Sequence, residues 1–500
     1  MAPVLQTQEM TVGGAQIRIV LRPENLKPDD KRVITRLFDP HNPRRIRAML
    51  NRVMRLDKQT VAELLASVLE DFGPRHRDIE AVLLENYQSV VLPHYPELKV
   101  SRERQLLLGS YYTMEYSIES AALFNPAIVP HPDQSDLPAG SVRFLMSLRA
   151  TGEGHVSSIV FRCGVLSADC DIQLDPPPRY AYTAKPIPDR FFDKHLFFRK
   201  LMEMGVYEEL VAQTLENLPD QFNLDQLRDA INQVRQQPDT PRAYKNVAAD
   251  MLWLAYANYE LEFPSDSPAS EIVIFPATRS ESHGMEDLRL TCFTDEDGQT
   301  RYCGTYTAYD GFRTLPMMLE TSDFRRFQVH TLNGQHAKNK GMALFPRKVN
   351  DCYMMIARHD GENLFLLTSD NIHFWNDARK LQGPAEPWEF VQIGNCGSPL
   401  ETDAGWLLLT HGVGPVRQYA IGALLLDRDD PGKVIGRMRK PLLSPLHDQR
   451  QGYVPNVVYT CGSMIHQDQL VIPYAVSDSR TSFATINARD LIHLLLENGP

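Results

Sequence analysis

The pattern of hydrophobic and polar residues divides this 500-residue chain into two parts. Up to about residue 110, after a short strand-like run at 16–21, apolar residues recur every three or four positions, as on one face of an α-helix. From about residue 111, short apolar runs alternate with turns rich in Gly, Pro, Asn and Asp, which is typical of an all-β domain. We therefore predict a mostly helical N-terminal region over 1–110 and a β-domain over 111–500.

The clearest helical pattern begins after Asp57. Thr60 and Glu63 have the spacing of a capping box at its start, and Gly73 followed by Pro74 is a stop signal at its end. One face of this helix carries the apolar residues Val61, Leu64, Leu65, Val68, Leu69 and Phe72.

A second helical stretch interrupts the β-rich part at about 190–262. Residues 222–237 and 241–262 show helical periodicity, and Pro241 is placed as in the first turn of a helix. We predict a helical insertion into the β-domain, in addition to another N-terminal helix over about 76–90. Amphipathic helices must bury their apolar faces, so we expect both helical parts to cover a face of the β-domain or to form an oligomer contact.

An internal repeat distinguishes between the possible β architectures. The pattern Leu-x-Thr-Ser-Asp-x-x-x-Phe occurs at 319–327 and again 47 residues later at 366–374, with a weaker echo at 166–169. In each full copy a Ser-Asp turn follows an apolar strand, and the spacing is close to the length of one β-propeller blade. The repeat therefore favours a propeller over a sandwich or a barrel.

Composition excludes several classes of function. The net charge of -11, with no long basic run, argues against nucleic acid or an anionic membrane as the main partner. The N-terminus lacks a signal-peptide pattern, and no apolar run has the length of a membrane span. Seven scattered cysteines, none in Cys-x-x-Cys spacing, indicate reduced thiols rather than disulfides or a zinc site. We expect a cytoplasmic protein without a metal or other cofactor.

The segment SHGMEDLRLTCF holds the first group of candidate catalytic residues. Glu286, Asp287 and Arg289 cluster at the start of a predicted strand. A carboxylate beside a guanidinium is usually a structural ion pair. The functional alternative is a carboxyl group held as a general acid, with its pKa set by its neighbours.

Basic residues on two neighbouring β-elements form a second candidate group. Lys338 and Lys340 precede an apolar strand, and Arg358 and His359 follow another. Side chains that point to the same side here would form a cationic pocket for an oxyanion such as phosphate. Lys338 is equally well explained as a surface lysine, whereas Lys340 stands close to the strand.

Polar residues at strand ends form a third group. Asn125 enters a predicted strand, Arg149 and Asp478 lie at strand ends, and His411 follows an apolar run. Such side chains suit sugar hydroxyls, although Asn-Pro is also an ordinary turn and a lone His is more often structural. The chain has no P-loop, G-x-G-x-x-G or G-x-S-x-G motif, which argues against kinase, dehydrogenase and esterase chemistry.

Taken in order, these segments resemble glycoside hydrolase family 130, the β-mannoside phosphorylases and mannosidases. The matching landmarks span roughly residues 115–490 and include FNPAIV, MEDLR, KGMALFP, GWLLLTHGV and GYVPNVVYTCG. The resemblance implies a five-bladed β-propeller with the site in its central funnel. It also implies cleavage of β-linked mannosides, with inorganic phosphate as co-substrate and α-mannose 1-phosphate as the product of an inverting reaction.

The resemblance further implies roles for individual residues. Asp287 matches the Asp of the family's E-D-P-R motif and is therefore expected to be the general acid. The candidate substrate contacts are Asn125, Arg149, Glu286, Arg289, His411 and Asp478. The candidate phosphate contacts are Lys340, Arg358 and, in a looser part of the match, Arg313.

Several positions depart from the family pattern. Leu288 replaces the motif Pro, Ala357 replaces the usual His before Arg358, and 473–478 differs from the usual Y-Y-G-x-x-D ending. An acidic residue common before G-x-V-x-N is missing at 450–451. These departures leave two alternatives open. One is an inverting β-mannosidase, which needs a second carboxylate to activate water; the other is a non-catalytic mannan-binding propeller.

Overall fold

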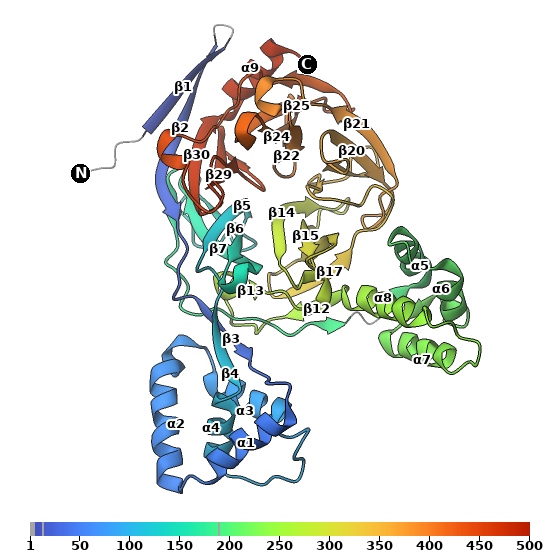
Figure 1. Ribbon diagram of the computed structural model, residues 1–500. Helices are drawn as coiled ribbons and strands as arrows, with labels where there is room; N and C mark the ends of the chain where they lie inside the picture. The colour runs from blue at the N-terminus through green and yellow to red at the C-terminus, as the bar shows by residue number, and fades with distance from the viewer. Residues whose placement is uncertain (1–5, 13–14, 189–190) are drawn as a thin grey trace.

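The computed structural model describes residues 6–12, 15–188 and 191–500. Five antiparallel β-sheets form most of the chain beyond residue 117, and Figure 1 shows them grouped around one centre. Helices lie in two further groups, one formed by residues before the sheets and one beside sheet residues 259–331. The prediction of a β-rich fold is confirmed.

The first three sheets, named I to III in chain order, follow one another along the chain. Sheet I contains β5 (Ala122–Pro130), β6 (Val142–Thr151), β7 (Ser157–Leu166), β8 (Ile172–Leu174) and β13 (Val273–Ile274). Sheet II contains β9 (Ile187–Pro188), β12 (Tyr259–Glu262), β14 (Met285–Thr294), β15 (Thr300–Tyr309), β16 (Thr314–Thr321) and β17 (Arg326–Thr331). Sheet III contains β18 (Ala343–Leu344), β19 (Tyr353–Ala357), β20 (Leu364–Ser369) and β21 (Asp377–Gln382).

Two more sheets complete the group. Sheet IV contains β22 (Gln392–Asn395), β23 (Leu400–Thr402), β24 (Gly405–Val413), β25 (Tyr419–Leu426) and β26 (Val434–Arg437). Sheet V contains β1 (Gln6–Val12), β2 (Ala15–Leu26), β27 (Val458–Tyr459), β28 (Met464–His466), β29 (Gln469–Val476) and β30 (Arg480–Asn487). Two small pairs lie outside the five sheets: β3 (Val33–Leu37) with β4 (Thr113–Ser117), and β10 (Phe192–Asp193) with β11 (Gln221–Phe222).

Sheet V joins the two ends of the chain. Its strand β2, near the N-terminus, pairs antiparallel with β30, near the C-terminus, from Ile19 opposite Ile486 to Leu26 opposite Thr481. The strand-like run at 16–21 belongs to β2, but strand structure extends further than predicted, to Leu26 and into β3. The helix α9 (Ala488–Asn498) follows β30 and buries Leu491, Leu494 and Leu495 completely against this part of the fold.

The Ser-Asp repeat marks the same place in three sheets. Residues 322–323 connect β16 to β17, residues 369–370 lie between β20 and β21, and the weaker echo at 166–169 lies between β7 and β8. Each is the turn between the third and fourth strands of its sheet, counted from β14, β18 and β5. The predicted repeat therefore reflects a repeated four-strand unit.

Aromatic side chains pack adjacent sheets against one another. Phe161 of β7 stacks on Phe327 of β17 with ring centres 6.0 Å apart, which joins sheets I and II. Phe345, next to β18, meets Trp406 of β24 at 5.0 Å in an edge-to-face contact, which joins sheets III and IV. Offset and edge-to-face pairs of this kind contribute about 0.5–1.5 kcal/mol beyond area burial.

Four helices lie between β3 and β4: α1 (Pro43–Met54), α2 (Lys58–Phe72), α3 (Ile79–Val90) and α4 (Arg102–Ser110). They pack around apolar clusters of their own. The expected capping box at the start of α2 is wrong, because Asp57 is the N-cap and accepts a hydrogen bond from the Thr60 backbone N–H at 2.8 Å. Aspartate caps a helix as well as Thr does, so the helix begins three residues earlier than the box predicts.

The insertion forms a four-helix group with its own core: α5 (Lys194–Glu203), α6 (Glu208–Leu215), α7 (Leu224–Arg235) and α8 (Tyr244–Tyr256). Its expected first residue, 190, lies outside the described residues. Pro241 does not lie in the first turn of α8, since the N-cap is Ala243. Residues 259–262 are not helical; they form β12, which pairs with β17 of sheet II.

Two predictions about the chain as a whole can be compared with the structure. All seven cysteines lie in the described residues and are free thiols, as their spacing indicated. None of the described helices combines the length and apolar character needed to cross a membrane.

Candidate active site

Each of the five sheets has an edge strand that carries or adjoins a candidate residue. These strands are β5 in sheet I, β14 in sheet II, β18 in sheet III, β22 in sheet IV and β27 in sheet V. We call this group the central cluster. Its members are Asn125, Arg149, Glu286, Asp287, Arg289, Lys340, Arg358, Asn395, His411, Tyr459 and Asp478.

Hydrogen bonds and ion pairs between sheets hold the central cluster together. Asn125 of β5 donates from Nδ2 to Asp287 Oδ1 of β14 at 2.7 Å. Arg289 of β14 donates to the Tyr459 hydroxyl of β27 at 2.6 Å. Lys340, which precedes β18, pairs with Glu286 of β14. Sheet II therefore contacts sheets I, III and V through side chains at their edges.

Irregular backbone turns the key side chains out of the normal strand alternation. The register shifts between Phe124 and Ala127 in β5 and between Glu286 and Arg289 in β14. Asn125 lies in the first shift with φ 49°, and Asp287 lies in the second with φ 58°. Bulges of this kind commonly redirect side chains next to functional sites, and Asn and Asp tolerate positive φ better than most residues.

Arg149 of β6 bridges the two acidic groups of β14. One terminal nitrogen lies 3.3 Å from Asp287 Oδ1 and the other lies 3.2 Å from Glu286 Oε1. The side chains of all three residues remain 13–21% exposed, so a ligand can reach them. The predicted clustering of Glu286 and Asp287 with a guanidinium is present, but the partner that contacts both carboxylates is Arg149.

Arg289 has a different place. It is buried, donates to the Asp287 backbone carbonyl at 3.0 Å and to the Tyr459 hydroxyl, and lies under the bulge. Its charge helps to hold the Asp287 carboxyl ionised, and its hydrogen bonds fix the bulged backbone. Arg289 is therefore placed to position Asp287 from behind, whereas Arg149 contacts the carboxyl group directly.

The two aspartates of the cluster differ in acidity. Burial opposes ionisation of Asp287, but the charges of Arg149 and Arg289 and the hydrogen bond from Asn125 outweigh it, so its pKa is lowered. Burial, followed by repulsion from Asp287, raises the pKa of Asp478 to about 7, against the attraction of Arg149. Neighbouring carboxyl groups with separated pKa values are a common arrangement for proton transfer.

A second part of the cluster is cationic and rich in unpaired polar atoms. Arg358 follows β19, and its Nε is buried without a hydrogen-bond partner among the described residues. Asn395, at the end of β22, is fully buried, and both polar atoms of its amide also lack a described partner. A Cβ placed on Gly341 would lie 3.6 Å from Arg358 Nε and 3.7 Å from Asn395 Oδ1, so the two side chains meet at one point.

His411 lies in β24 and forms part of the floor of the cluster. Its ring is 1% exposed, packs edge-on against Tyr459 at 4.9 Å and lies 3.4 Å from Gln392. Burial, with the positive charges of Arg358 and Arg289, holds its pKa well below the ordinary value. The imidazole is therefore neutral. It packs against Tyr459 and can offer a ligand a hydrogen bond but no charge.

The remaining basic candidates are not part of this group. Arg313 is more than half exposed and pairs with Asp250 of α8 at 3.6 Å, and no hydrogen bond or ion pair among the described residues joins it to Lys340 or Arg358. Lys338 is exposed.

Two cluster residues have no counterpart in the sequence-based candidates: Asn395 and Tyr459. Asn395 lies in QIGNCGSP and is a polar residue at a strand end, which is the same signal that identified Asn125.

Two departures from the family motifs, Leu288 and Ala357, have a packing explanation. Leu288 fills the space above Gly304, where a Cβ would come within 2.7 Å of its Cδ1, and Ala357 is fully buried in β19.

Comparison with known proteins identifies the family. A sequence profile described as beta-1,4-mannooligosaccharide phosphorylase matches residues 266–497. A beta-1,2-mannobiose phosphorylase from Thermoanaerobacter sp. (strain X514) is 32% identical over 210 residues, which cover 41% of this chain and 68% of that protein. The chain belongs to glycoside hydrolase family 130. The resemblance seen in the sequence is thereby confirmed.

Other relatives of this family 130 chain are more partial. A 1,2-beta-oligomannan phosphorylase from the same Thermoanaerobacter strain is 35% identical over 155 residues, covering 31% of this chain and 52% of that protein. A beta-1,2-mannobiose phosphorylase from Listeria innocua is 28% identical over 230 residues, covering 44% and 63%. The chain therefore matches between half and two thirds of the length of these two relatives. The solved Listeria innocua enzyme aligns with a TM-score of 0.43 at 19% identity, covering 76% of this chain and 93% of that one.

Proposed function

We propose that the five sheets form a five-bladed β-propeller over 111–500, completed by β1 and β2 from the N-terminal region, with the central cluster in its funnel. Five antiparallel sheets of four to six strands, a third turn that three of them share and pairing between the two chain ends support this architecture. In this proposal the residues before β4 form a mostly helical N-terminal region, and about 190–262 is a helical insertion. These two parts limit substrate length or carry an oligomer contact.

The activity that we propose is inverting phosphorolysis of β-mannosides, giving α-mannose 1-phosphate. The relatives named above are phosphorylases of β-mannobiose and manno-oligosaccharides, which supports this substrate class. Linkage and the acceptor sugar stay outside the proposal, because the relatives include both β-1,2 and β-1,4 enzymes. Inorganic phosphate is a co-substrate here, and no cofactor is required.

The observation that best supports phosphorolysis is a set of buried polar atoms near Gly341 that have no hydrogen-bond partner among the described residues. Buried polar atoms are nearly always hydrogen-bonded, and each one left unpaired costs about 1–3 kcal/mol. Arg358 Nε and both amide atoms of Asn395 are such atoms, and the two side chains meet beside Gly341, the residue that follows Lys340. A phosphate bound here would accept from Arg358 and Asn395 and would draw Lys340 from Glu286.

Asp287 is the proposed general acid. Phosphate oxygen attacks the anomeric carbon, the bond from that carbon to the glycosidic oxygen breaks, and the proton of Asp287 passes to the departing oxygen, directly or through a sugar hydroxyl. An acid must first hold a proton, yet Arg149 and Arg289 lower the pKa of Asp287. A bound phosphate dianion opposes that field, because a nearby negative charge raises a carboxyl pKa.

The mannosyl unit is proposed to lie against the other end of the cluster. Asn125 keeps its Oδ1 buried and without a described partner while Nδ2 holds Asp287, so the oxygen is available to a sugar hydroxyl. Arg149 and Asp478 lie beside the same carboxyl group. Glu286 and His411 are proposed as further contacts, and Arg289 as a positioning residue.

Hydrolysis is the second candidate, and one observation favours it. An inverting hydrolase needs a carboxylate about 6.5–9.5 Å from the acid to activate water. Asp478 interacts electrostatically with Asp287 and has a pKa of about 7, which suits a general base near neutral pH. A protein that only binds mannan would use the same contacts but release no product.

The decisive experiment is product analysis with β-mannobioses of each linkage, with and without inorganic phosphate. We expect mannose 1-phosphate to form only when phosphate is present. Lys340→Ala and Arg358→Ala should raise the KM for phosphate strongly. Lys338→Ala is the matched control, because this lysine lies two residues from Lys340 but is exposed.

Three results would count against phosphorolysis. Free mannose released at the same rate without phosphate would establish hydrolysis. Saturable mannobiose binding without any product would establish a binding protein. Equal effects of the Lys338 and Lys340 variants on the KM for phosphate would remove Lys340 from the phosphate site.

A further inference from the structure

A second cluster of chemically capable side chains lies away from the central cluster, on the outer strands of sheet II. Among the described residues, Glu320, His330 and His373 form a group whose ligand atoms all lie within 4.8 Å of one another. Glu320 is in β16, His330 is in β17, and His373 is in the turn between β20 and β21 of sheet III. Two imidazoles and a carboxylate from two different sheets therefore converge.

The strand register explains how two of the three residues meet. In the antiparallel pair, Glu320 lies opposite Gln328 and Met318 lies opposite His330. Directly opposed residues share a face and side chains alternate, so Glu320 and His330 are diagonal neighbours on the same face. The spacing of diagonal neighbours, about 7–8 Å between backbones, is within reach of these long side chains.

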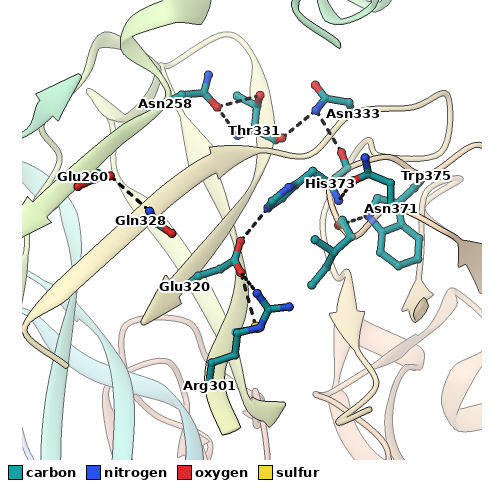
Figure 2. A network of polar contacts seen from close by, with 12 residues as sticks. Asn258, Glu260, Arg301, Glu320, Gln328, Thr331, Asn333, Asn371, His373 and Trp375 are labelled. Atoms are coloured by element: carbon teal, nitrogen blue, oxygen red, sulfur yellow. Dashed lines mark hydrogen bonds and ion pairs between the residues drawn. The ribbon is translucent and has the colours of Figure 1, made fainter. Parts of the chain in front are cut away.

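A rigid connection between sheets brings the third residue in. The Asn333 backbone N–H donates to the His373 carbonyl at 2.9 Å, and the Trp375 N–H donates to the Asn333 carbonyl at 2.7 Å. Asn333 Nδ2 also donates to the His373 carbonyl, and the His373 N–H donates to Asn371 Oδ1. Figure 2 shows this network and the His373 ring directed at the Glu320 carboxylate. His373 is therefore held in place by backbone contacts on both sides.

The carboxylate is oriented by a separate partner. Arg301 donates from Nη1 to Glu320 Oε2 at 3.1 Å, while His373 Nε2 lies 2.7 Å from Glu320 Oε1 (Figure 2). Arg301 thus holds Oε2 of Glu320, and Oε1 faces His373. Metal-binding carboxylates usually have such an outer hydrogen bond on the oxygen that does not bind the metal.

An ion pair between His373 and Glu320 is the simpler explanation of part of this cluster. His330 lies beside this pair, with its ring centre 4.9 Å from that of His373. The blade repeat does not explain the cluster. One repeat later, Leu367 stands at the position of Glu320, and Arg326 stands one repeat before His373.

A cavity of about 160 Å³ borders the cluster, between sheet II and the helical insertion. Both histidines line it, together with Thr331, Asn258 and Lys200. Lys200 is directed away by hydrogen bonds to the Leu332 carbonyl at 2.7 Å and to Glu203 at 3.2 Å. The cavity is polar on this side and large enough for a water molecule.

We propose that Glu320, His330 and His373 bind a divalent transition metal of the zinc class, with water from the cavity as the fourth ligand. Two His nitrogens and one carboxylate oxygen are a common three-ligand set for Zn²⁺, with bonds of about 2.0–2.2 Å. Ligand atoms around a tetrahedral ion at these distances lie roughly 3.3 Å apart, so small rotations of His373 and Glu320 make room for it. The metal joins sheets II and III beside the insertion.

Cobalt titration of the full-length protein without a histidine tag tests the site directly. We expect one equivalent of Co²⁺ to give the visible absorption of a tetrahedral site, and Zn²⁺ to displace it. Mg²⁺ should neither bind nor displace, because imidazole ligands disfavour hard cations. Glu320→Gln, His330→Ala and His373→Ala should each weaken Co²⁺ binding by at least about 100-fold, the upper end of what loss of an outer-shell partner costs.

A matched control exists on α9, where exposed His493 pairs with Glu497 at 3.3 Å without a second histidine. His493→Ala should leave Co²⁺ binding unchanged. Melting of each variant in EDTA separates loss of metal from loss of folding, because a folded variant keeps the melting temperature of the parent in EDTA. Absence of Co²⁺ binding by the parent would show an ion pair only. Full binding by His330→Ala would equally overturn the three-ligand site.

Discussion

Asp478 should make the folded protein less stable as pH rises, and Asp478→Asn should remove that loss. Burial and the nearby charge of Asp287 raise its pKa from the ordinary 3.8 to about 7. Asparagine has nearly the same shape as the protonated side chain and carries no charge at any pH. The substitution therefore isolates the free-energy cost of ionising this carboxyl group in its folded surroundings.

The sign and size follow from proton linkage. Below about pH 4, Asp478 is protonated in both the folded and the unfolded chain, so its charge contributes nothing. Between about pH 4 and 7 the folded state keeps a proton that the unfolded state has lost, so stability falls as pH rises. Above pH 7 the loss is complete. A shift of about three pKa units, at 1.36 kcal/mol each, corresponds to about 4 kcal/mol.

The assay is urea unfolding of the parent and of Asp478→Asn at intervals from pH 4 to pH 8.5. We expect the difference in free energy of unfolding to grow by about 4 kcal/mol in favour of the variant across that range. Asp370→Asn is the matched control, because Asp370 also follows a serine at a strand end but is exposed. A gain of the same size in this control would show that the effect does not come from burial of the carboxyl group.

A third variant tests the cause. In an Asp287→Asn background the pH-dependent gain from Asp478→Asn should shrink, since Asp287 is the second largest contribution to the raised pKa after burial. A difference between parent and Asp478→Asn that stays constant with pH would refute the reasoning. So would a gain that grows as pH falls.

Two further predictions concern the general acid and the start of α2. Asp287→Asn should lower kcat by about 10²–10⁴-fold, as expected for loss of a general acid, while calorimetry shows mannobiose binding retained; near-normal turnover would remove Asp287 from this role. Asp57→Ala should cost about 1 kcal/mol of helix stability because it removes the N-cap of α2, whereas Thr60→Ala should cost less, since that variant keeps the backbone N–H that Asp57 caps and loses only the side-chain hydrogen bond to Asp57. If chemical unfolding showed equal losses of stability for Asp57→Ala and Thr60→Ala, the capping box that starts at Thr60 would again be the better interpretation.

Local patterns in the sequence predicted the local structure well. The Ser-Asp turns at 322–323 and 369–370 mark equivalent turns because a short strand, a polar turn and an aromatic residue are all properties of neighbouring residues. The helix α3 lies within the predicted 76–90, and Asn125, Arg149 and Asp287 lie in one group, as the family resemblance implied. These signals depend on residues close to one another in the chain.

Contacts between distant segments could not be predicted in the same way. The pairing of β2 with β30 joins segments more than 450 residues apart, and nothing in the run at 16–21 specifies its partner. The link between Arg289 and Tyr459 depends on how sheets II and V meet. Glu320 and His330 belong to sheet II, whereas His373 belongs to sheet III. Their convergence can therefore be recognised only once the strand register and the packing of the two sheets are known.

Several of the residues proposed to act on substrate break local rules. Asn125, Asp287 and Asp478 all have φ between 48° and 58°, a conformation that costs free energy for side chains with a Cβ. Asp478 is ionised only against burial and a neighbouring charge, and Arg358 and Asn395 bury polar atoms without described partners. A stable framework would avoid all of these, because each one opposes folding. Their concentration at the meeting edges of five sheets is expected of a site whose missing partners are a sugar and an anion, and it explains why Asp478→Asn should stabilise the protein while impairing its proposed function.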